Sequence, residues 1–229
     1  MADRVATLKR RAVIQTVLSI PALAVLLFVP AGSLRFWQGW LFAAVFIAVS
    51  AALGLYFIKH DPALIERRMS VGPAAETEPV QKIVMAIVMI GVLLMMVLPG
   101  LDYRWHWSAV PVWLVLLGNA SVILSFIAFF VVMKQNSYAA ATIRVEPGQT
   151  LASTGLYGIV RHPMYAGALV LLVGAPLALG SYWTLLVAVP MIAALAWRLL
   201  DEERLLLRDL PGYADYCRNV RYRLVPGIW

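Results

Sequence analysis

Residues 36–58 read FWQGWLFAAVFIAVSAALGLYFI and contain no charged side chain. As an α-helix, a stretch of this length would extend about 35 Å at 1.5 Å per residue, more than the ~30 Å thickness of the hydrocarbon core of a bilayer. Three further apolar stretches are candidates for crossing a membrane, at residues 12–30, 83–98 and 109–133. The sequence therefore predicts transmembrane helices within the first 133 residues.

Two shorter apolar stretches follow, at residues 164–179 and 183–200. Each would be about 24 to 27 Å long as a helix, so they predict a helical hairpin that is either tilted or stops short of the far face. Pro211-Gly212 is expected to split the polar tail, residues 201–229, into two short helices. We expect an all-α integral membrane protein with about six transmembrane helices, the last two forming a short hairpin, and a cytoplasmic C-terminal helical tail.

The composition supports a membrane protein. Of the 229 residues, 62% are apolar and 14% are charged, whereas soluble domains carry about 25% charged and 45–50% apolar residues. A soluble single domain is therefore excluded. The net charge of +7 does not indicate a nucleic-acid partner, because the basic residues are scattered between apolar stretches. The single cysteine, Cys217, excludes a disulfide framework and a multi-cysteine metal site.

The loops of a six-helix arrangement alternate in charge. Seventeen of the 19 Lys and Arg residues fall on one side, and only Arg35 and Arg104 fall on the other. The positive-inside rule then places both termini in the cytoplasm, and in a bacterium the protein would lie in the inner membrane. Residues 12–30 could instead be a signal peptide, because basic residues precede them. Their apolar run is longer than usual for a signal peptide, which favours a retained first helix.

Polar residues that can carry chemistry cluster between residues 136 and 163. Here Gln149-Thr150-Leu151-Ala152-Ser153-Thr154-Gly155-Leu156-Tyr157 leads into Arg161-His162-Pro163-Met164-Tyr165-Ala166-Gly167. Pro163 suits the first turn of a helix, where its missing N–H is not needed. Arg161 and His162 should therefore lie at the membrane mouth of this helix, with Tyr165 just inside. Gly167 and Gly174 are small enough for another backbone or a flat ligand to approach closely.

A second polar cluster follows the predicted hairpin, at residues 198–206. Arg198 and Glu202 are four residues apart and so share one helical face. Since a hairpin returns the chain to the side where it entered, this face is expected near Arg161 and His162. Simpler interpretations exist for each residue alone. Arg161 could anchor a lipid headgroup, and Arg198 and Glu202 could form a surface pair that contributes only ~0.3 to 0.5 kcal/mol.

As a set, these motifs resemble the isoprenylcysteine carboxyl methyltransferase family, which forms a broader group with the phospholipid methyltransferases. The resemblance covers roughly the last 90 residues. One departure is the ending Pro226-Gly227-Ile228-Trp229, where eukaryotic members close on a Pro-Phe-Ile type of sequence. The motifs that carry the resemblance are Gly155-Leu156-Tyr157, Arg161 to Gly167, Glu202-Glu203 with Leu206, Gly212-Tyr213, Tyr216 and Val225-Pro226-Gly227-Ile228.

The resemblance implies methyl transfer from S-adenosylmethionine, with S-adenosylhomocysteine as product and no metal, at the cytoplasmic face. Residues 1–133 would then form an N-terminal four-helix transmembrane region, and residues 134–229 a methyltransferase core whose tail closes the cofactor pocket. The expected partners are membrane lipids and a lipophilic small molecule or lipid-linked substrate.

The resemblance also assigns residues to roles. Arg198 falls where the family holds its substrate, and the candidate catalytic residues are Arg198, Glu203 and Arg161. The implied cofactor-binding residues are Gln149, Thr150, Leu151, Ala152, Tyr157, His162, Pro163, Met164, Tyr165 and Glu202.

The chemistry of S-adenosylmethionine agrees with these assignments. Its ammonium group needs an acceptor, which Glu202 can supply, and its carboxylate needs donors, which His162 with Tyr157 or Tyr165 can supply. A carboxylate or thiolate methyl acceptor needs no general base, and Arg198 could hold such an anion. An amine acceptor, as in a phospholipid N-methyltransferase, must first lose a proton, and Glu203 is the candidate base.

A transporter or a non-catalytic scaffold is the alternative outside enzymes. Transporters place ionisable groups near the bilayer midplane. The central thirds of the apolar stretches contain no Asp, Glu, Lys, Arg or His, and the polar clusters lie on one predicted face. This distribution favours the enzyme.

Overall fold

The computed structural model describes residues 2–69, 72–76, 78–138 and 148–229. Within these ranges the chain is helical and has no strand, which confirms the all-α class. The elements in chain order are α1 (Ala2–Ala31), α2 (Trp37–His60), α3 (Pro62–Met69), η1 (Pro73–Ala75), α4 (Pro79–Trp105), α5 (Val112–Gln135), η2 (Gly155–Gly158), α6 (Pro163–Ala178), α7 (Leu185–Asp209) and α8 (Tyr213–Asn219).

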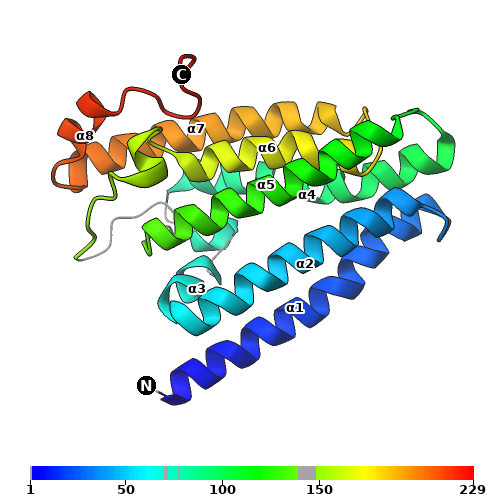
Figure 1. Ribbon diagram of the computed structural model, residues 1–229, viewed down its shortest axis with the longest axis horizontal. Coiled ribbons are helices and arrows are strands. Elements are labelled where there is room, and N and C mark those ends of the chain that lie inside the picture. Colours follow the sequence, from blue (N-terminus) through cyan, green and yellow to red (C-terminus); the bar gives the residue numbers. More distant parts are fainter. Residues whose placement is uncertain (1, 70–71, 77, 139–147) are drawn as a thin grey trace.

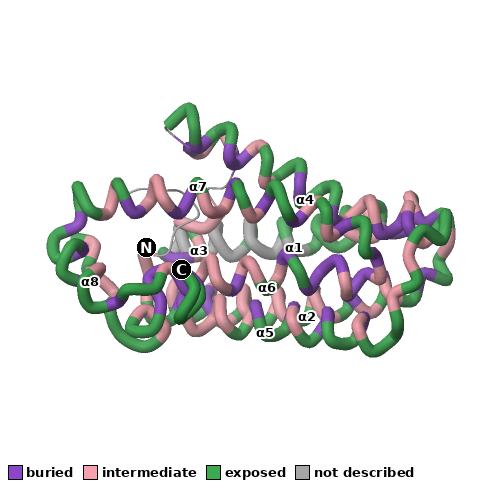
Figure 2. Tube along the Cα trace, turned by 90° about the horizontal axis from the view of Figure 1, so that it is seen from above, coloured by how far each residue is buried: buried purple, intermediate pink, exposed green. Residues whose placement is uncertain are grey.

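The long helices run back and forth along the long axis of the molecule (Figure 1). Helix α5 packs along α6, while α4 contacts both α1 and α7. The start of α1 and the C-terminal residues lie at the same end in the two perpendicular views (Figures 1 and 2). Helix α8 lies at that end too, so the polar C-terminal segment and the N-terminal end of α6 are brought together there.

Three helices are long and apolar enough to cross a membrane among the described residues: α2, α4 and α5, with 24, 27 and 24 residues. Helix α6 has only 16 residues, about 24 Å at 1.5 Å per residue, as expected for the short hairpin. Large apolar side chains such as Leu55 and Trp113 are more than 60% exposed on the outer faces. Such a surface fits contact with lipid. Six transmembrane helices remain a prediction.

The short helix α3 begins with a side-chain cap and a proline. Leu64 N–H donates to Oδ1 of Asp61 at 3.1 Å, which satisfies an unpaired amide of the first turn of α3. Pro62 occupies the first helical position, where it needs no N–H donor. This helix delivers Arg68 to the end of the bundle where the cavity described below is found.

The polar tail differs from the prediction in one respect. Residues 201–209 are not a separate short helix but the last turns of α7, which is continuous from Leu185 to Asp209. Its Leu, Glu and Arg residues all favour a helix, and Arg204 pairs with Asp201 at 2.8 Å across one turn. The break does fall at Pro211-Gly212, where Gly212 has a φ of +83° that side chains rarely adopt.

Helices α5 and α6 are in close contact through glycines. A Cβ atom at Gly118 would lie 2.7 Å from the carbonyl oxygen of Gly174, and one at Gly174 would lie 2.7 Å from Cβ of Ser121. A Cβ atom at Gly167 would lie 2.9 Å from the ring of Phe129. Gly167 and Gly174 therefore allow the neighbouring helix α5 to approach closely. Of the two partners that the sequence allowed, a backbone or a flat ligand, the structure shows the backbone.

A buried carboxylate lies beside the turn between α6 and α7, at the end of the bundle away from α8 (Figure 1). Asp102, near the end of α4, is 1% exposed. Its oxygens accept hydrogen bonds from the amide of Ser108 at 2.7 Å and from the hydroxyls of Ser108 and Ser181 at 2.7 and 2.5 Å. These bonds tie the α4–α5 connection to the α6–α7 turn, and so help to set where α6 and α7 start and end.

We predict that Gly118→Ala destabilises the protein, because a methyl group at this position would force α5 and α6 apart. The expected loss is about 1 to 3 kcal/mol, the range typical of overpacked cores, and it would be read as a lower apparent melting temperature in mild detergent. Gly54→Ala is the matched control, since a Cβ atom there meets nothing within 4 Å. Equal melting of Gly118→Ala and the wild type would contradict the close contact.

Candidate active site

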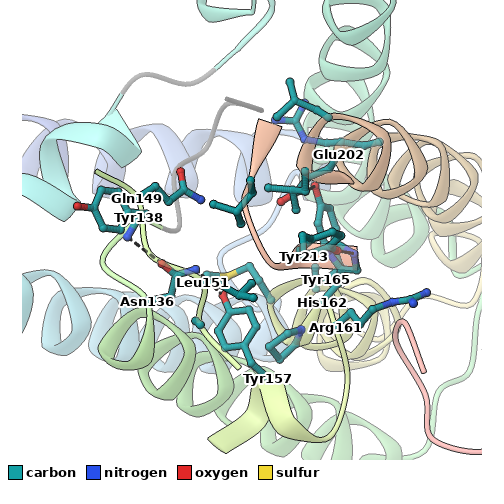
Figure 3. Close-up of a pocket in the computed structure, with 18 of the residues that line it drawn as sticks. Asn136, Tyr138, Gln149, Leu151, Tyr157, Arg161, His162, Tyr165, Glu202 and Tyr213 are labelled. Atoms are coloured by element: carbon teal, nitrogen blue, oxygen red, sulfur yellow. Dashed lines mark hydrogen bonds between the residues drawn. The ribbon is translucent and has the colours of Figure 1, made fainter. Parts of the chain in front are cut away.

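A cavity of about 320 Å³ lies at the end of the bundle where α6 begins. Side chains from α4, α5, α6, α7 and α8 line it, together with the segment after residue 148 (Figure 3). Its volume is within the range of small-molecule sites, about 300 to 1,000 Å³. The cavity thus combines residues that lie far apart in the sequence, from Arg68 to Tyr216.

The residues predicted from the sequence converge on this cavity. All ten candidate cofactor-binding residues line it, and so do Arg161 and Arg198. His162 and Glu202 in particular line the same space although the α6–α7 hairpin separates them in sequence, so one small molecule can contact both (Figure 3). Glu203 is the exception among the predicted residues, because it lies behind the lining.

The backbone around His162 is held by the C-terminal segment. The amide of Arg161 donates to the carbonyl of Tyr222 at 2.9 Å, and the amide of His162 donates to that of Arg223 at 2.9 Å. His162 is the residue that precedes α6, and Pro163 occupies the first turn, as expected. The imidazole is therefore fixed at the mouth of α6.

Glu203 joins three basic side chains behind the cavity. Its Oε1 lies 2.8 Å from Nε of Arg161 and 3.2 Å from Nε2 of His162, and its Oε2 accepts a hydrogen bond from Nε of Arg223 at 2.8 Å. Burial alone would raise the pKa of Glu203, but the hydrogen bonds with His162 and Arg223 and the charge of Arg161 hold it below its ordinary value of 4.5. The carboxylate is therefore ionised, and each of its two oxygens has a basic partner within the protein.

This arrangement decides between two interpretations of Arg161. A lipid-headgroup anchor would extend into the headgroup region, whereas Arg161 is 9% exposed and ion-paired with Glu203. Its guanidinium contributes positive charge to the cavity wall. The lipid-anchor interpretation does not fit the structure.

Phenol groups line the cavity between the charged groups. Tyr165 donates to Oε2 of Glu202 at 2.5 Å, across from α6 to α7. Asn136 donates to the hydroxyl of Tyr157 at 3.2 Å, and burial raises the pKa of Tyr157 to about 12. Burial likewise raises the pKa of Tyr213. These phenols stay neutral at physiological pH and act as hydrogen-bonding groups.

Arg198 does not form the solvated surface pair that its spacing from Glu202 allowed. It is 7% exposed, its Nη2 donates to Oε1 of Glu76 at 2.7 Å, and its Nη1 donates to Oε1 of Gln81 at 3.0 Å. The interpretation as an exposed i,i+4 pair is wrong, because the N-terminal end of α4 covers this face of α7. Arg198 nevertheless lines the cavity together with Glu202.

Several residues of the site were not predicted from the sequence. Arg68 comes from α3, and burial lowers the pKa of its guanidinium. Met85 and Val88 come from α4, and Tyr138 follows α5. Nothing in the local sequence around these residues distinguishes them from other loop or membrane-helix residues. Tyr213 and Tyr216 belong to the family motifs, which was the only signal for a role in the site.

The comparisons with known proteins agree with this site. Residues 113–210 match the phospholipid methyltransferase family, and this segment includes α5, η2, α6 and nearly all of α7. This segment is therefore similar to phospholipid methyltransferases, which confirms the resemblance predicted from the motifs.

One curated relative is Delta(14)-sterol reductase TM7SF2 of Mus musculus, 29% identical over 93 residues. The alignment covers 38% of this chain and 22% of the relative, so this chain matches about a fifth of that protein's length.

We predict that Glu203→Gln destabilises the protein at pH 7. The expected loss is about 2 kcal/mol, below the 3 to 5 kcal/mol typical of broken buried pairs, because Arg223 is 31% exposed. Since the folded pKa of Glu203 is lowered, its stabilisation is complete above pH 4.5 and is lost as pH falls through the folded value. The difference in melting temperature should therefore close below pH 4.5.

The control for this pH series is Asp215→Asn, which removes a carboxylate from an ion pair whose side chains are more than 70% exposed. Exposed pairs contribute little, so this variant should melt like the wild type throughout. A Glu203→Gln difference that persists unchanged at pH 3.5 would argue against an ionised Glu203.

Proposed function

We propose that this protein is a membrane methyltransferase that uses S-adenosylmethionine and acts on a lipophilic acceptor at the cytoplasmic face. One observation carries the proposal: His162 and Glu202, from two motifs on either side of a hairpin, line the same cavity together with every other candidate cofactor-binding residue. The family match over residues 113–210 supports methyl transfer. Both chain ends lie at the cavity end of the bundle, which is consistent with cytoplasmic termini and an even number of crossings.

The donor and acceptor groups of the cavity fit S-adenosylmethionine. Glu202 accepts a hydrogen bond from Tyr165 with one oxygen, and a carboxylate has about four acceptor positions, so it can also accept from the ammonium of the cofactor. Arg161 supplies positive charge for the cofactor carboxylate, and His162 supplies a ring nitrogen that can form a hydrogen bond with it. Leu151, Met164 and Leu206 supply apolar surface for the adenine.

Bound S-adenosylmethionine supplies a methyl group on a positively charged sulfur. In the transfer, a lone pair of the acceptor forms the new bond to carbon while the carbon–sulfur bond breaks and its electrons return to sulfur. The reaction neutralises the sulfonium, so alignment and exclusion of water contribute most of what the protein can add. The ion pairs of Glu203 fix the position of His162 at one side of the cavity. The hydrogen bond from Tyr165 fixes the carboxylate of Glu202 at another side.

The acceptor is expected to be lipophilic because Met85, Val88 and Leu195 line the cavity. These side chains come from α4 and α7, so the proposed division into a transmembrane region (1–133) and a methyltransferase core (134–229) leaves part of the acceptor surface to the first region. An acceptor of the isoprenylcysteine type that attacks as a carboxylate, or as a thiol already ionised to the thiolate, needs no base and is the leading candidate.

A phospholipid amine of the phosphatidylethanolamine type is the second candidate, favoured by the description of the matched family. An amine must be deprotonated before it attacks. Glu203 is the base that the sequence suggests. In the structure, however, its carboxylate oxygens already bind two guanidinium groups and an imidazole. Glu203 therefore fits a positioning role, and a lipid amine would need another proton acceptor, for which Glu202 is the cavity-lining carboxylate.

We predict that purified protein binds S-adenosylhomocysteine, and that Glu202→Ala and His162→Ala each weaken binding by about 10- to 100-fold. This range corresponds to the loss of a charge-assisted hydrogen bond, about 1.5 to 3 kcal/mol. Isothermal titration calorimetry in detergent would measure it. Asp215→Ala, at an exposed ion pair outside the cavity lining, should bind normally. Absence of binding at millimolar ligand would refute the cofactor assignment.

We predict that membranes incubated with methyl-labelled cofactor and a prenylated cysteine analogue yield a base-labile methyl ester. The same incubation with phosphatidylethanolamine should leave the lipid unlabelled. Label in phosphatidylethanolamine with no ester would replace the leading acceptor by the second candidate. A His162→Ala preparation serves as the control for endogenous activity, since it should lose both products.

A further inference from the structure

Arg198 is engaged by a buried polar chain that comes from a different part of the sequence. Its Nη2 donates to Oε1 of Glu76 at 2.7 Å and its Nη1 donates to Oε1 of Gln81 at 3.0 Å. Gln81 in turn donates from Nε2 to Oδ2 of Asp201 at 2.8 Å. Glu76 and Gln81 are 5% and 3% exposed. Both terminal nitrogens of the guanidinium thus have acceptors within the protein.

Glu76 lies outside the segment that matches the methyltransferase family. It follows η1, in the connection between α3 and α4, whereas Arg198 lies on α7, 122 residues later. The two meet because α4 packs against α7. The contact therefore joins the first part of the chain to the segment that matches the family, at a residue that lines the cavity.

The ion pair changes what Arg198 can offer to an acceptor. A carboxylate binds guanidinium through its N–H groups, and Glu76 and Gln81 each accept from one of the two terminal nitrogens. The Glu76 carboxylate also balances the buried positive charge of Arg198. An acidic acceptor that binds Arg198 must therefore approach a second carboxylate of like charge, while an acceptor without negative charge meets no such repulsion.

We propose that Glu76 is a specificity-determining residue: its charge beside the guanidinium of Arg198, which lines the cavity, lowers the affinity for a carboxylate acceptor relative to a neutral one without excluding it. This rests on the proposed function, because it takes the cavity beside Arg198 as the acceptor site. Glu76→Gln keeps the size of the side chain and one oxygen that can accept from Arg198, but it removes the competing charge. The variant is expected to bind carboxylates more tightly and neutral analogues unchanged.

The test compares N-acetyl-S-farnesylcysteine with its uncharged carboxamide, both measured by equilibrium binding to full-length protein saturated with S-adenosylhomocysteine. The ratio of the two dissociation constants should shift toward the acid by about tenfold in Glu76→Gln, equivalent to 1.4 kcal/mol. A merely structural role of Glu76 would change both affinities together and leave the ratio unaltered. Glu78→Gln, which removes an exposed carboxylate two residues away, is the matched control and should keep the wild-type ratio.

An unchanged ratio in Glu76→Gln, or absence of carboxylate binding while S-adenosylhomocysteine still binds, would overturn this proposal and leave the cofactor assignment standing. Failure of the wild type to bind S-adenosylhomocysteine would instead refute the proposed function. If Glu76→Gln does not fold, Glu76→Asp keeps the charge on a shorter side chain and should give a smaller shift in the same direction. A shift toward the amide would count against the proposal.

Discussion

The carboxylate of Glu203 is the interaction on which the site depends. From α7 it binds side chains of two other segments: Arg161 and His162 before α6, and Arg223 in the C-terminal segment. An unpaired charge in this buried position would be costly, so the start of α6, the end of α7 and the C-terminal residues have to assemble together. The backbone bonds from Arg161 and His162 to Tyr222 and Arg223 follow the same alignment. His162 therefore owes its place at the cavity to a residue that does not line it.

Charge is separated from apolar surface along the length of the molecule. The cavity end carries Glu203, Glu202 and Arg198, which are paired or hydrogen-bonded across elements. The helices α2, α4 and α5 expose apolar side chains over long stretches. At the far end Asp102 is satisfied by hydroxyl and amide donors. This distribution fits the proposed function, in which a polar cofactor and a lipophilic acceptor meet at one end of an apolar bundle.

Much of the site followed from short-range patterns. Pro163 placed His162 at the start of a helix, the apolar hairpin returned Glu202 to the same end, and the motif residues from Gln149 to Tyr165 all line the cavity. Errors arose where a partner was far away in sequence. The spacing of Arg198 and Glu202 suggested a surface pair, but Glu76 covers Arg198. The tail was expected to form two separate helices, but its first part extends α7, because strong helix formers continue without a break to Asp209.

Periodicity, apolar length and local capping follow from neighbouring residues, so the amino-acid order alone determined the helical class, the hairpin and the two motifs of the site. The partner of a buried charge depends on which distant surfaces meet. Only the tertiary structure could show that Glu203 holds Arg161, His162 and Arg223, and that Glu76 engages Arg198. The reason is physical: a buried carboxylate needs a cation beside it, and the guanidinium groups at 2.8 Å from Glu203 and 2.7 Å from Glu76 come from remote segments.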